Sequence, residues 1–367
     1  MKKMVFSVNK SMIYTSIIIL TLLIAGCENI DVSKVSDKGS LQKETEEKPV
    51  ETTENTKIRT KQQSGQIIKI FEDDTISDFD IWGDKIVFLG GGKKYDWAIY
   101  LYDIPTKELK RITYDSSSKR TPLIYNDLIF WNDERFADNN IFVYNLSSGK
   151  EKSIFQRLWV FDNFEDILFV LDGFSGRWYL KFLDENKNID LPVEFKDMDY
   201  YNIYDNKIML TKSHGSISTT DYVIPLRNIL YYDFLANKFV QVTNNTLDEK
   251  DPHIYKNKIV WSDNRNGKFN YDVYLYDLDT KQETQITSQQ DTNELYPSIY
   301  GDYIVYLKSG KEKDIYLYNI ETKEEKKIPE KAGLISEKPL KIYDNKVVWR
   351  TCKDDWCADE ELYLYII

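Results

Sequence analysis

The chain repeats one pattern in which short hydrophobic runs alternate with polar turns. In the segment from Asn257 to Thr287, "NKIVWSDNRNGKFNYDVYLYDLDTKQETQIT", a β-branched and aromatic run precedes a polar loop. A second run from Asp272 to Leu278, a turn rich in Asp and Thr, and an alternating run follow. Hydrophobic runs of this length between turn residues predict strands. The preceding "DPHIYK" adds a further strand, so the unit is a four-stranded antiparallel sheet of about forty residues, the size of one propeller blade.

The unit recurs along residues 66–367. Its second strand is repeated as "GDKIVF", "NDLIFW", "EDILFV", "DNKIML", "KNKIVW", "GDYIVY" and "DNKVVW". Its third strand is repeated seven times, from "AIYLYDI" at 98–104 to "ELYLYII" at 361–367. Seven such units predict an all-β, seven-bladed β-propeller with four antiparallel strands per blade. We expect most of the 27 Tyr and 8 Trp residues to fill its core, the alternative being a carbohydrate-binding role.

The fourth strand occurs only six times within these units, which predicts how the ring closes. The segment "QIIKIF", from Gln66 to Phe71, has the fourth-strand pattern and lies upstream of the first unit. We expect it to be the outer strand of the seventh blade, because this pairing closes the ring and removes an exposed sheet edge. The alternative is a leading strand of the first blade.

The repeats resemble those of the TolB-like (WD-like) β-propeller superfamily. The resemblance rests on the pattern P-x-I-Y-x-(D/N)-x-I-V-W, then (D/N)-I-Y-L-Y-(D/N)-L, then T-K-x-E-x-x-I-T, over residues 66–367. It implies the propeller fold. It says little about activity, because such propellers serve as binding scaffolds, enzyme domains and partner platforms alike.

The N-terminal segment indicates a lipoprotein. Residues before Glu28 include three lysines and no acid, and the apolar run from Ile17 to Ala25 lies within them. The sequence "LLIAGC" from Leu22 to Cys27 resembles the bacterial lipobox. The resemblance implies that residues 1–26 are a signal peptide and that Cys27 carries acyl chains such as palmitate. An uncleaved membrane span is the alternative, although the apolar run is short for the roughly 20 residues that a span needs.

The lipobox predicts a compartment, and the composition restricts the partners. We expect the chain to be anchored to the extracytoplasmic face of a membrane in the cell envelope. Residues 27–65 have few large apolar residues and many charges, which is typical of a disordered tether. Removal of residues 1–26 changes the formal net charge from −11 to −14, because three lysines are lost. An acidic chain without a basic stripe argues against nucleic acid as a partner.

Two further cysteines lie in "TCKDDWC", between the second and third strands of the last blade. In an oxidising or permissive compartment we predict a disulfide between Cys352 and Cys357. A metal site would need more ligands, and a redox pair usually has the C-x-x-C spacing.

The geometry of the family predicts where a ligand binds. Loops between the second and third strands and connections between blades share one face, and here they are long. Binding residues are commonly found on such loops. Two "W-x-D-x-R" segments place Asp133 with Arg135 and Asp263 with Arg265 there, either as pairs that brace the loop or as ligand contacts. His214 lies in the longest insertion, "KSHGSISTTDYVIPLR", in the fourth blade.

The connections between blades are acidic, which raises the question of a cation. A ring of carboxylates is a candidate Ca²⁺ site, but no D-x-D-x-D-G loop is present, so we interpret these residues as solvated loop acids and expect no cofactor. They are Asp73, Asp74, Asp78, Asp248, Glu249, Asp251, Asp291 and Glu294.

Two functional hypotheses remain. The first is a membrane-anchored binding or scaffold propeller that engages an envelope protein or glycan through its long-loop face. The second is a propeller enzyme similar to polysaccharide lyases or quinone-dependent dehydrogenases. The chain has only two histidines and no G-x-S-x-G segment, which favours the first hypothesis.

Overall fold

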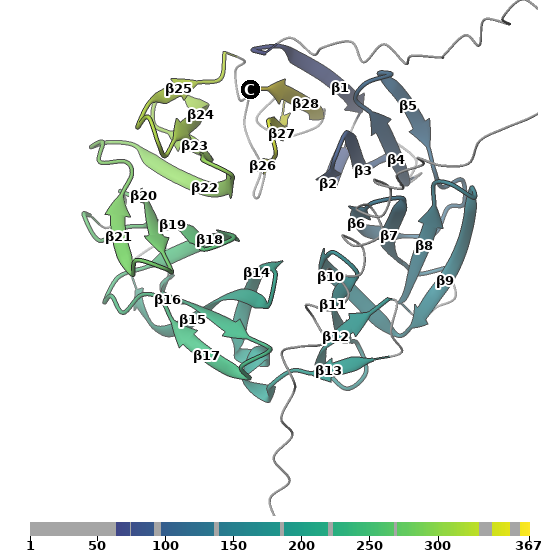
Figure 1. Cartoon of the computed structure of the whole chain (residues 1–367), viewed down its shortest axis with the longest axis horizontal. Helices are drawn as coiled ribbons and strands as arrows, with labels where there is room; N and C mark the ends of the chain where they lie inside the picture. The colour runs from purple at the N-terminus through teal and green to yellow at the C-terminus, as the bar shows by residue number, and fades with distance from the viewer. Residues whose placement is uncertain are drawn as a thin grey trace, which may run out of the picture. The chain divides into compact units, whose positions relative to one another are not determined.

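A computed structural model of the chain describes residues 64–73, 75–91, 97–135, 139–183, 187–218, 223–267, 270–329, 340–352 and 360–367. They form seven four-stranded antiparallel sheets arranged around one axis (Figure 1). The prediction of an all-β, seven-bladed propeller is confirmed. The predicted signal peptide and the lipidated Cys27 lie outside the described residues, as does most of the tether. Within the described residues, no helix has the length and apolar character of a membrane span.

Six blades take their strands consecutively from the chain. Blade 1 contains β2 (Thr75–Trp82), β3 (Lys85–Gly91), β4 (Ala98–Asp103) and β5 (Glu108–Arg111). Blade 2 contains β6 (Lys119–Tyr125), β7 (Leu128–Asp133), β8 (Asn140–Asn145) and β9 (Lys150–Gln156). Blade 3 contains β10 (Leu158–Phe164), β11 (Ile167–Asp172), β12 (Trp178–Phe182) and β13 (Asn188–Asp190), and the 3₁₀ helix η1 (Val193–Asp197) follows it.

The remaining blades continue the series. Blade 4 contains β14 (Met198–Tyr204), β15 (Lys207–Ser218), β16 (Val223–Asp233) and β17 (Lys238–Gln241). Blade 5 contains β18 (Glu249–Tyr255), β19 (Lys258–Asp263), β20 (Asp272–Asp277) and β21 (Gln282–Gln285). Blade 6 contains β22 (Asn293–Tyr300), β23 (Tyr303–Ser309), β24 (Lys313–Asn319) and β25 (Glu325–Lys327). Blade 7 contains β26 (Leu340–Tyr343), β27 (Lys346–Cys352) and β28 (Glu360–Ile366), with β1 (Ile67–Asp73) as its outer strand.

Strand β1 closes the ring, as the strand count predicted. It pairs antiparallel with β28, with Ile67 opposite Tyr365, and the two strands lie side by side in Figure 1. The amide of Gly65 donates a hydrogen bond of 2.7 Å to the carbonyl of Ile366, which extends the pairing by one step. The first and last blades are therefore joined by backbone hydrogen bonds, and β28 has a paired edge.

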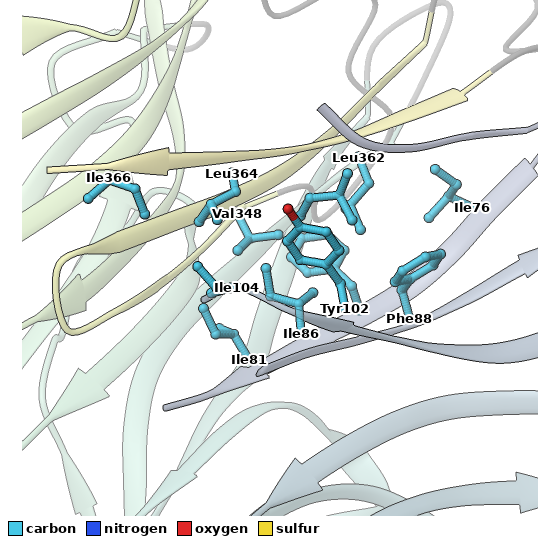
Figure 2. Packing of buried hydrophobic residues seen from close by; sticks show 12 residues of the cluster. Ile76, Ile81, Ile86, Phe88, Tyr102, Ile104, Val348, Leu362, Leu364 and Ile366 are labelled. Atoms are coloured by element: carbon cyan, nitrogen blue, oxygen red, sulfur yellow. The ribbon is translucent and has the colours of Figure 1, made fainter. Parts of the chain in front are cut away.

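The core lies between neighbouring blades. Between blades 7 and 1, Leu362, Leu364 and Val348 pack against Ile86 and Phe88, all fully buried (Figure 2). Aromatic residues of the second strands lie in the same inter-blade layers: Trp131, Trp261, Tyr306 and Trp349 are each 0% exposed. Core packing is thus confirmed for these aromatic residues, which bury large surfaces in wedge-shaped gaps.

The innermost strands each end in an aromatic residue, and these residues follow one another around the ring. We call them the aromatic collar: Trp82, Tyr125, Phe164, Tyr204, Tyr255, Tyr300 and Tyr343. From Phe164 through Tyr343 and Trp82 to Tyr125, neighbouring rings are in contact, for example with centroids 4.3 Å apart for Tyr255 and Tyr300. Each is followed by a two-residue turn to the second strand. The collar therefore marks the face on which the short turns lie, which we call the tight-turn face.

Side-chain hydrogen bonds also join the innermost strands of neighbouring blades. In four blades, the residue two places before the collar aromatic accepts a hydrogen bond from a backbone amide of the next blade. The acceptors are Asp80 (2.9 Å), Asp162 (3.1 Å), Asn202 (3.2 Å) and His253 (3.4 Å). Lys341 of blade 7 binds Asp80 at 2.9 Å, so the same position also joins the last blade to the first.

Candidate binding face

The long-loop face is where second strands end and third strands begin. In blade 5, Asp263 at the end of β19 lies opposite both Glu249 and Asp272, the first residues of β18 and β20. The connection from blade to blade therefore reaches the same edge as the loop between the second and third strands. Asp133 and Arg135 occupy the corresponding edge of blade 2.

The Asp–Arg pair of blade 2 is a closed structural unit. Asp133 is 0% exposed and accepts hydrogen bonds from Trp131 Nε1 (2.9 Å) and Arg135 Nη2 (2.7 Å). Burial alone would raise the pKa of Asp133, but the hydrogen bonds from Arg135 and Trp131 lower it. Arg135 lies 4.0 Å above the ring of Phe142 and binds Glu151 at 2.6 Å. The guanidinium is therefore fixed by a carboxylate on each side and an aromatic face below.

Blade 5 repeats this arrangement. Asp263 is 0% exposed and accepts hydrogen bonds from Trp261 Nε1 (3.1 Å) and Arg265 Nε (2.9 Å). Arg265 lies 4.1 Å above the ring of Tyr274 and also binds Glu283. In both blades the carboxylate is buried inside its own pair and braces the loop, whereas the arginine beside it is partly exposed.

The two units differ in the residue at the start of the first strand. In blade 2 this residue is Lys119, whose ammonium binds Asp115 at 2.8 Å. In blade 5 it is Glu249, which lies opposite Asp263. Asn245 lies between them and donates hydrogen bonds to both carboxylates. Burial and the negative charge of Asp263 raise the pKa of Glu249 to about 7. The same frame therefore holds an extra cation in one blade and an extra acid in the other.

The interpretation of the acidic connections as solvated loop acids is wrong for three residues. Asp248, Glu249 and Glu294 are at most 1% exposed. Arg227 forms a bidentate pair with Asp248, with Nε–Oδ1 and Nη2–Oδ2 distances of 2.9 Å. Tyr271 donates a further hydrogen bond of 2.8 Å to Asp248. The acids are buried because each has donors of its own, which compensate for the loss of water.

Arg227 comes from the fourth-blade insertion, which forms an ordered extension of the β15–β16 hairpin. The pairing continues from Ser213 opposite Arg227 to Ser218 opposite Val223. His214 is exposed on this hairpin. Among the described residues, no hydrogen bond or ion pair joins His214 to the Asp–Arg units. Sequence reasoning missed Arg227, since nothing in the sequence indicates which of many acids it meets.

A polar hollow of about 580 Å³ opens at the long-loop face of blade 5. We call it the blade-5 hollow, and it is lined by Asn266, Gly267, Asn270, Asp272, Gln285, Ser288, Gln290 and Asp291. Asp272 is 0% exposed, and its Oδ2 accepts hydrogen bonds from Asn266 (2.8 Å) and Gln285 (3.2 Å). Its Oδ1 has no hydrogen-bond partner among the described residues.

The tight-turn face has a hollow of its own, of about 500 Å³. Phe164 and Tyr204 of the aromatic collar line it, together with turn residues such as Lys256 and Asp279. It is more apolar than the blade-5 hollow, because Leu278 and two aromatic rings contribute to its wall.

The remaining predicted site residues are described only in part. Cys352 is buried at the end of β27, but Cys357 lies outside the described residues, so their disulfide stays a prediction. Across the part of the chain that the structure describes, no group of three or more His, Cys, Asp or Glu side chains is arranged to hold a metal ion.

No protein-family model matches the sequence, and no curated protein matches it. Solved structures of similar fold exist at low identity. The β-propeller domain of the Trilobed protease from Pyrococcus furiosus, described as having an open velcro topology, is 14% identical with a TM-score of 0.56, and the match covers 77% of this chain and 90% of that domain. TolB from Acinetobacter baumannii is 15% identical with a TM-score of 0.46, covering 66% of this chain and 63% of TolB.

A third similar structure is an enzyme. Oligogalacturonate lyase from Vibrio parahaemolyticus is 10% identical with a TM-score of 0.48, covering 80% of this chain and 81% of the lyase. In the match with the tricorn protease, the chain spans only 27% of that protein. Identities this low report on fold alone, and the Pyrococcus furiosus domain supports the β-propeller fold of this chain.

Proposed function

We propose that the chain is a lipid-anchored binding propeller of the cell envelope, which engages an envelope protein or glycan through its long-loop face. In this proposal acyl chains on Cys27 hold the protein at the extracytoplasmic face of a membrane. Two or more acyl chains suffice for stable anchoring. Residues 27–65 act as the tether, and the ring presents the binding face.

The observation that carries the proposal is the set of braced polar side chains on the long-loop face of blades 4 and 5. The Arg227–Asp248 pair joins blades 4 and 5, and Arg265 is fixed between Asp263 and Glu283. The blade-5 hollow lies on the same face. Side chains that are already fixed lose little conformational entropy when a partner binds, which favours affinity and specificity.

Site-specific photocrosslinking in native envelopes tests the binding face. A photoreactive residue at Gln290, on the long-loop face, should capture a partner that can be identified by mass. The same residue at Lys281, in the turn between β20 and β21, is the matched control on the tight-turn face of the same blade. Capture from Lys281 and not from Gln290 would mean that the partner binds the opposite face.

Replacement of Cys27 tests the anchor. The Cys27→Ala variant should either leave the membrane fraction or accumulate as an uncleaved precursor, because a lipid can no longer be attached through sulfur. Mass spectrometry and detergent partitioning measure both results. A variant with the mass and partitioning of the wild type would contradict the lipoprotein proposal.

We also propose the disulfide between Cys352 and Cys357, which would hold the loop between β27 and β28. Thiol labelling of unreduced, unfolded protein taken from its own compartment should modify neither residue. Labelling of both residues would show that the bridge does not form.

A further inference from the structure

The long-loop edge of blade 3 carries aromatic side chains where other blades carry polar or aliphatic ones. Across its first three strands, Trp159 lies opposite Leu171, and Leu171 lies opposite Trp178. The corresponding residues are Arg120, Asn132 and Ile141 in blade 2, Lys250, Ser262 and Val273 in blade 5, and Leu295, Leu307 and Ile315 in blade 6. The third-strand residues of those three blades are fully buried, whereas both tryptophans of blade 3 are only half-buried.

The aromatic side chains of this edge form a cluster that reaches from the core to the surface. Trp178 stacks on the fully buried Phe169, with ring centroids 4.7 Å apart. Phe161, in the bulge of β10, lies 4.9 Å from Trp178 and is 39% exposed. Gly173 packs against Trp159, since a Cβ at this position would lie 3.0 Å from Nε1 of the indole. The exposed part of the cluster is therefore held in place by the core.

The loop between β11 and β12 places one further aromatic side chain in solvent. Phe174 is 92% exposed, the highest value among the large hydrophobic side chains that the structure describes. The loop is held by Asp172 Oδ1, which accepts hydrogen bonds from the amides of Phe174 (2.8 Å) and Ser175 (3.2 Å). An exposed apolar patch on a fixed loop marks an interaction surface. We call these side chains the blade-3 patch: Trp159, Phe161, Phe174 and Trp178.

Three exposed arginines border the blade-3 patch. Arg120 of blade 2 lies 6.0 Å above the ring of Trp159, and its side chain is 60% exposed. The backbone carbonyl of Arg157 accepts a hydrogen bond from Gly173, and that of Arg177 accepts one from Asp172, so both arginines lie beside the loop. The patch thus combines aromatic rings with guanidinium groups, although the formal net charge of the whole chain is −11.

We propose that the blade-3 patch docks on the lipid bilayer to which the chain is anchored, with Phe174 entering the interface and the arginines contacting lipid phosphates. Aromatic side chains favour the boundary between head groups and acyl chains, and guanidinium groups bind phosphate. The inference rests on the lipid anchor of the proposed function. It adds an orientation of the ring, in which the long-loop face of blades 2 and 3 points towards the bilayer and the partner binds close to the membrane surface.

The length of the tether favours the bilayer as the occupant of this patch. About forty residues separate Cys27 from β1, and a random coil of that length has an end-to-end distance of about 35 Å. A contact that is weak between free molecules becomes populated at the effective concentration that such a tether imposes. Blade 3 lies across the ring from blade 6 (Figure 1), so docking through blade 3 tilts the acidic connections around blades 5 and 6 away from the lipid phosphates.

Site-specific photocrosslinking of the full, lipidated chain in native envelopes tests the inference. A photoreactive phenylalanine analogue at Phe174 should give an adduct whose added mass is that of a phospholipid. Leu235, in the turn between β16 and β17, is the matched control, because it is 68% exposed but lies on the tight-turn face. It should give at least about tenfold less lipid adduct, since burial of a phenylalanine side chain favours the docked orientation by this factor or more.

Two results of this experiment would overturn the inference. An adduct of Phe174 with a protein or a glycan in place of a phospholipid would mean that the patch docks on that partner. Equal lipid adducts from Phe174 and Leu235 would mean that the ring has no preferred orientation on the bilayer.

Variants show which groups make the contact, with the photoreactive residue moved to Ser175. Phe174→Asp should reduce the lipid adduct at least about tenfold, because a charge replaces the inserted ring. Arg177→Glu should reduce it about fivefold or more, because a cation near the lipid phosphates is lost. Leu235→Asp and Lys281→Glu make the same kinds of change on the tight-turn face and should leave the adduct unaltered. All four side chains are exposed, so folding is not at stake, and unaltered adducts in Phe174→Asp and Arg177→Glu would overturn the inference.

Reconstitution separates direct docking from recruitment by a third component. The purified lipidated chain in vesicles of phosphatidylcholine and phosphatidylglycerol should give the same lipid adduct from Phe174 as native envelopes. An adduct that forms in envelopes but not in these vesicles would overturn direct docking. If Phe174 gives no lipid adduct while Cys27 is lipidated and Gln290 still captures a partner, the inference fails and the proposed function stands.

Discussion

At the scale of single residues, the innermost strands show how a repeated position keeps its role while its residue type changes. Asp80, Asp162, Asn202 and His253 each accept a hydrogen bond from the backbone of the next blade. An oxygen acceptor and an imidazole nitrogen serve equally well for this bond. The residue types differ mainly in charge, and their response to pH differs accordingly.

His253 should make the protein sensitive to acid. Burial, followed by the nearby charge of Lys341, lowers its pKa to about 4. Between pH 6.5 and 4 the unfolded chain therefore gains a proton that the folded chain does not, so stability falls as the pH falls. In the wild type we expect this loss of stability to reach about 2 kcal/mol, since partial exposure of the imidazole reduces the effect of burial. The His253→Asn variant keeps a hydrogen-bond acceptor, as in blade 4, but has no group that titrates, so it should not show this loss. Urea unfolding at pH 7 and pH 4.5 measures it, and a difference between the two pH values as large as in the wild type would contradict it.

Glu249 should give the stability of the protein the opposite dependence on pH. Its pKa of about 7 lies above the ordinary 4.5, so from pH 4.5 to 7 the unfolded chain loses a proton that the folded chain keeps. Stability therefore falls as the pH rises through this window, by up to about 3 kcal/mol. Glu249→Gln cannot ionise, and relative to the wild type it should become more stable as the pH rises from 4.5 to 7.5. Glu283→Gln, at the exposed partner of Arg265, is the control; an equal pH trend in both variants would show that Glu249 is not the source.

At the scale of the element, strands could be predicted better than their contacts. The second and third strands were recognised in all seven blades because hydrophobic periodicity is local in sequence. The burial of Asp248 could not be recognised, because its partner Arg227 lies on another blade and meets it only through the register of β15 and β16.

In the β15–β16 hairpin, the contribution of the exposed extension to stability can be separated from that of the Arg227–Asp248 pair. Its outer residues, from His214 to Ser218, are largely exposed, whereas Arg227 is anchored on Asp248. Replacing residues 214–226 by Asn-Gly joins Ser213 to Arg227 through a two-residue hairpin turn and should change stability by less than about 1 kcal/mol. Arg227→Ala leaves Asp248 buried without its cation and should cost about 2–4 kcal/mol. Denaturant unfolding compares the two, and an equal loss in both variants would show that the anchor is not at Arg227.

At the scale of the whole molecule, the ring depends on one strand that is distant in sequence. The prediction that Gln66 to Phe71 completes the last blade could be made by counting, because six fourth strands do not complete seven blades. The structure extends that strand to Asp73 and shows its bulge between Lys69 and Phe71. Side-chain contacts between the innermost strands also help to close the ring, since Lys341 of blade 7 binds Asp80 of blade 1.

Removing β1 should therefore weaken the whole propeller. A chain that begins at Ser64 should melt like the full mature chain, because it keeps β1 intact. A chain that begins at Thr75 loses β1 and with it the buried Ile70, and it leaves β28 with unpaired backbone groups beside Leu362 and Leu364. An unpaired apolar edge invites aggregation, and the first and last blades lose their shared strand.

Thermal unfolding of the two truncated chains measures the effect, and a synthetic peptide of residues 66–73 provides the control. We expect the shorter chain to melt at a clearly lower temperature or to aggregate, and the peptide to restore part of the loss, because it can pair with β28 in the register that places Ile67 opposite Tyr365. Restoration by a scrambled peptide would point to a nonspecific effect. Equal melting temperatures of the two chains would show that the contacts between β26 and the neighbouring blades hold the ring closed without β1.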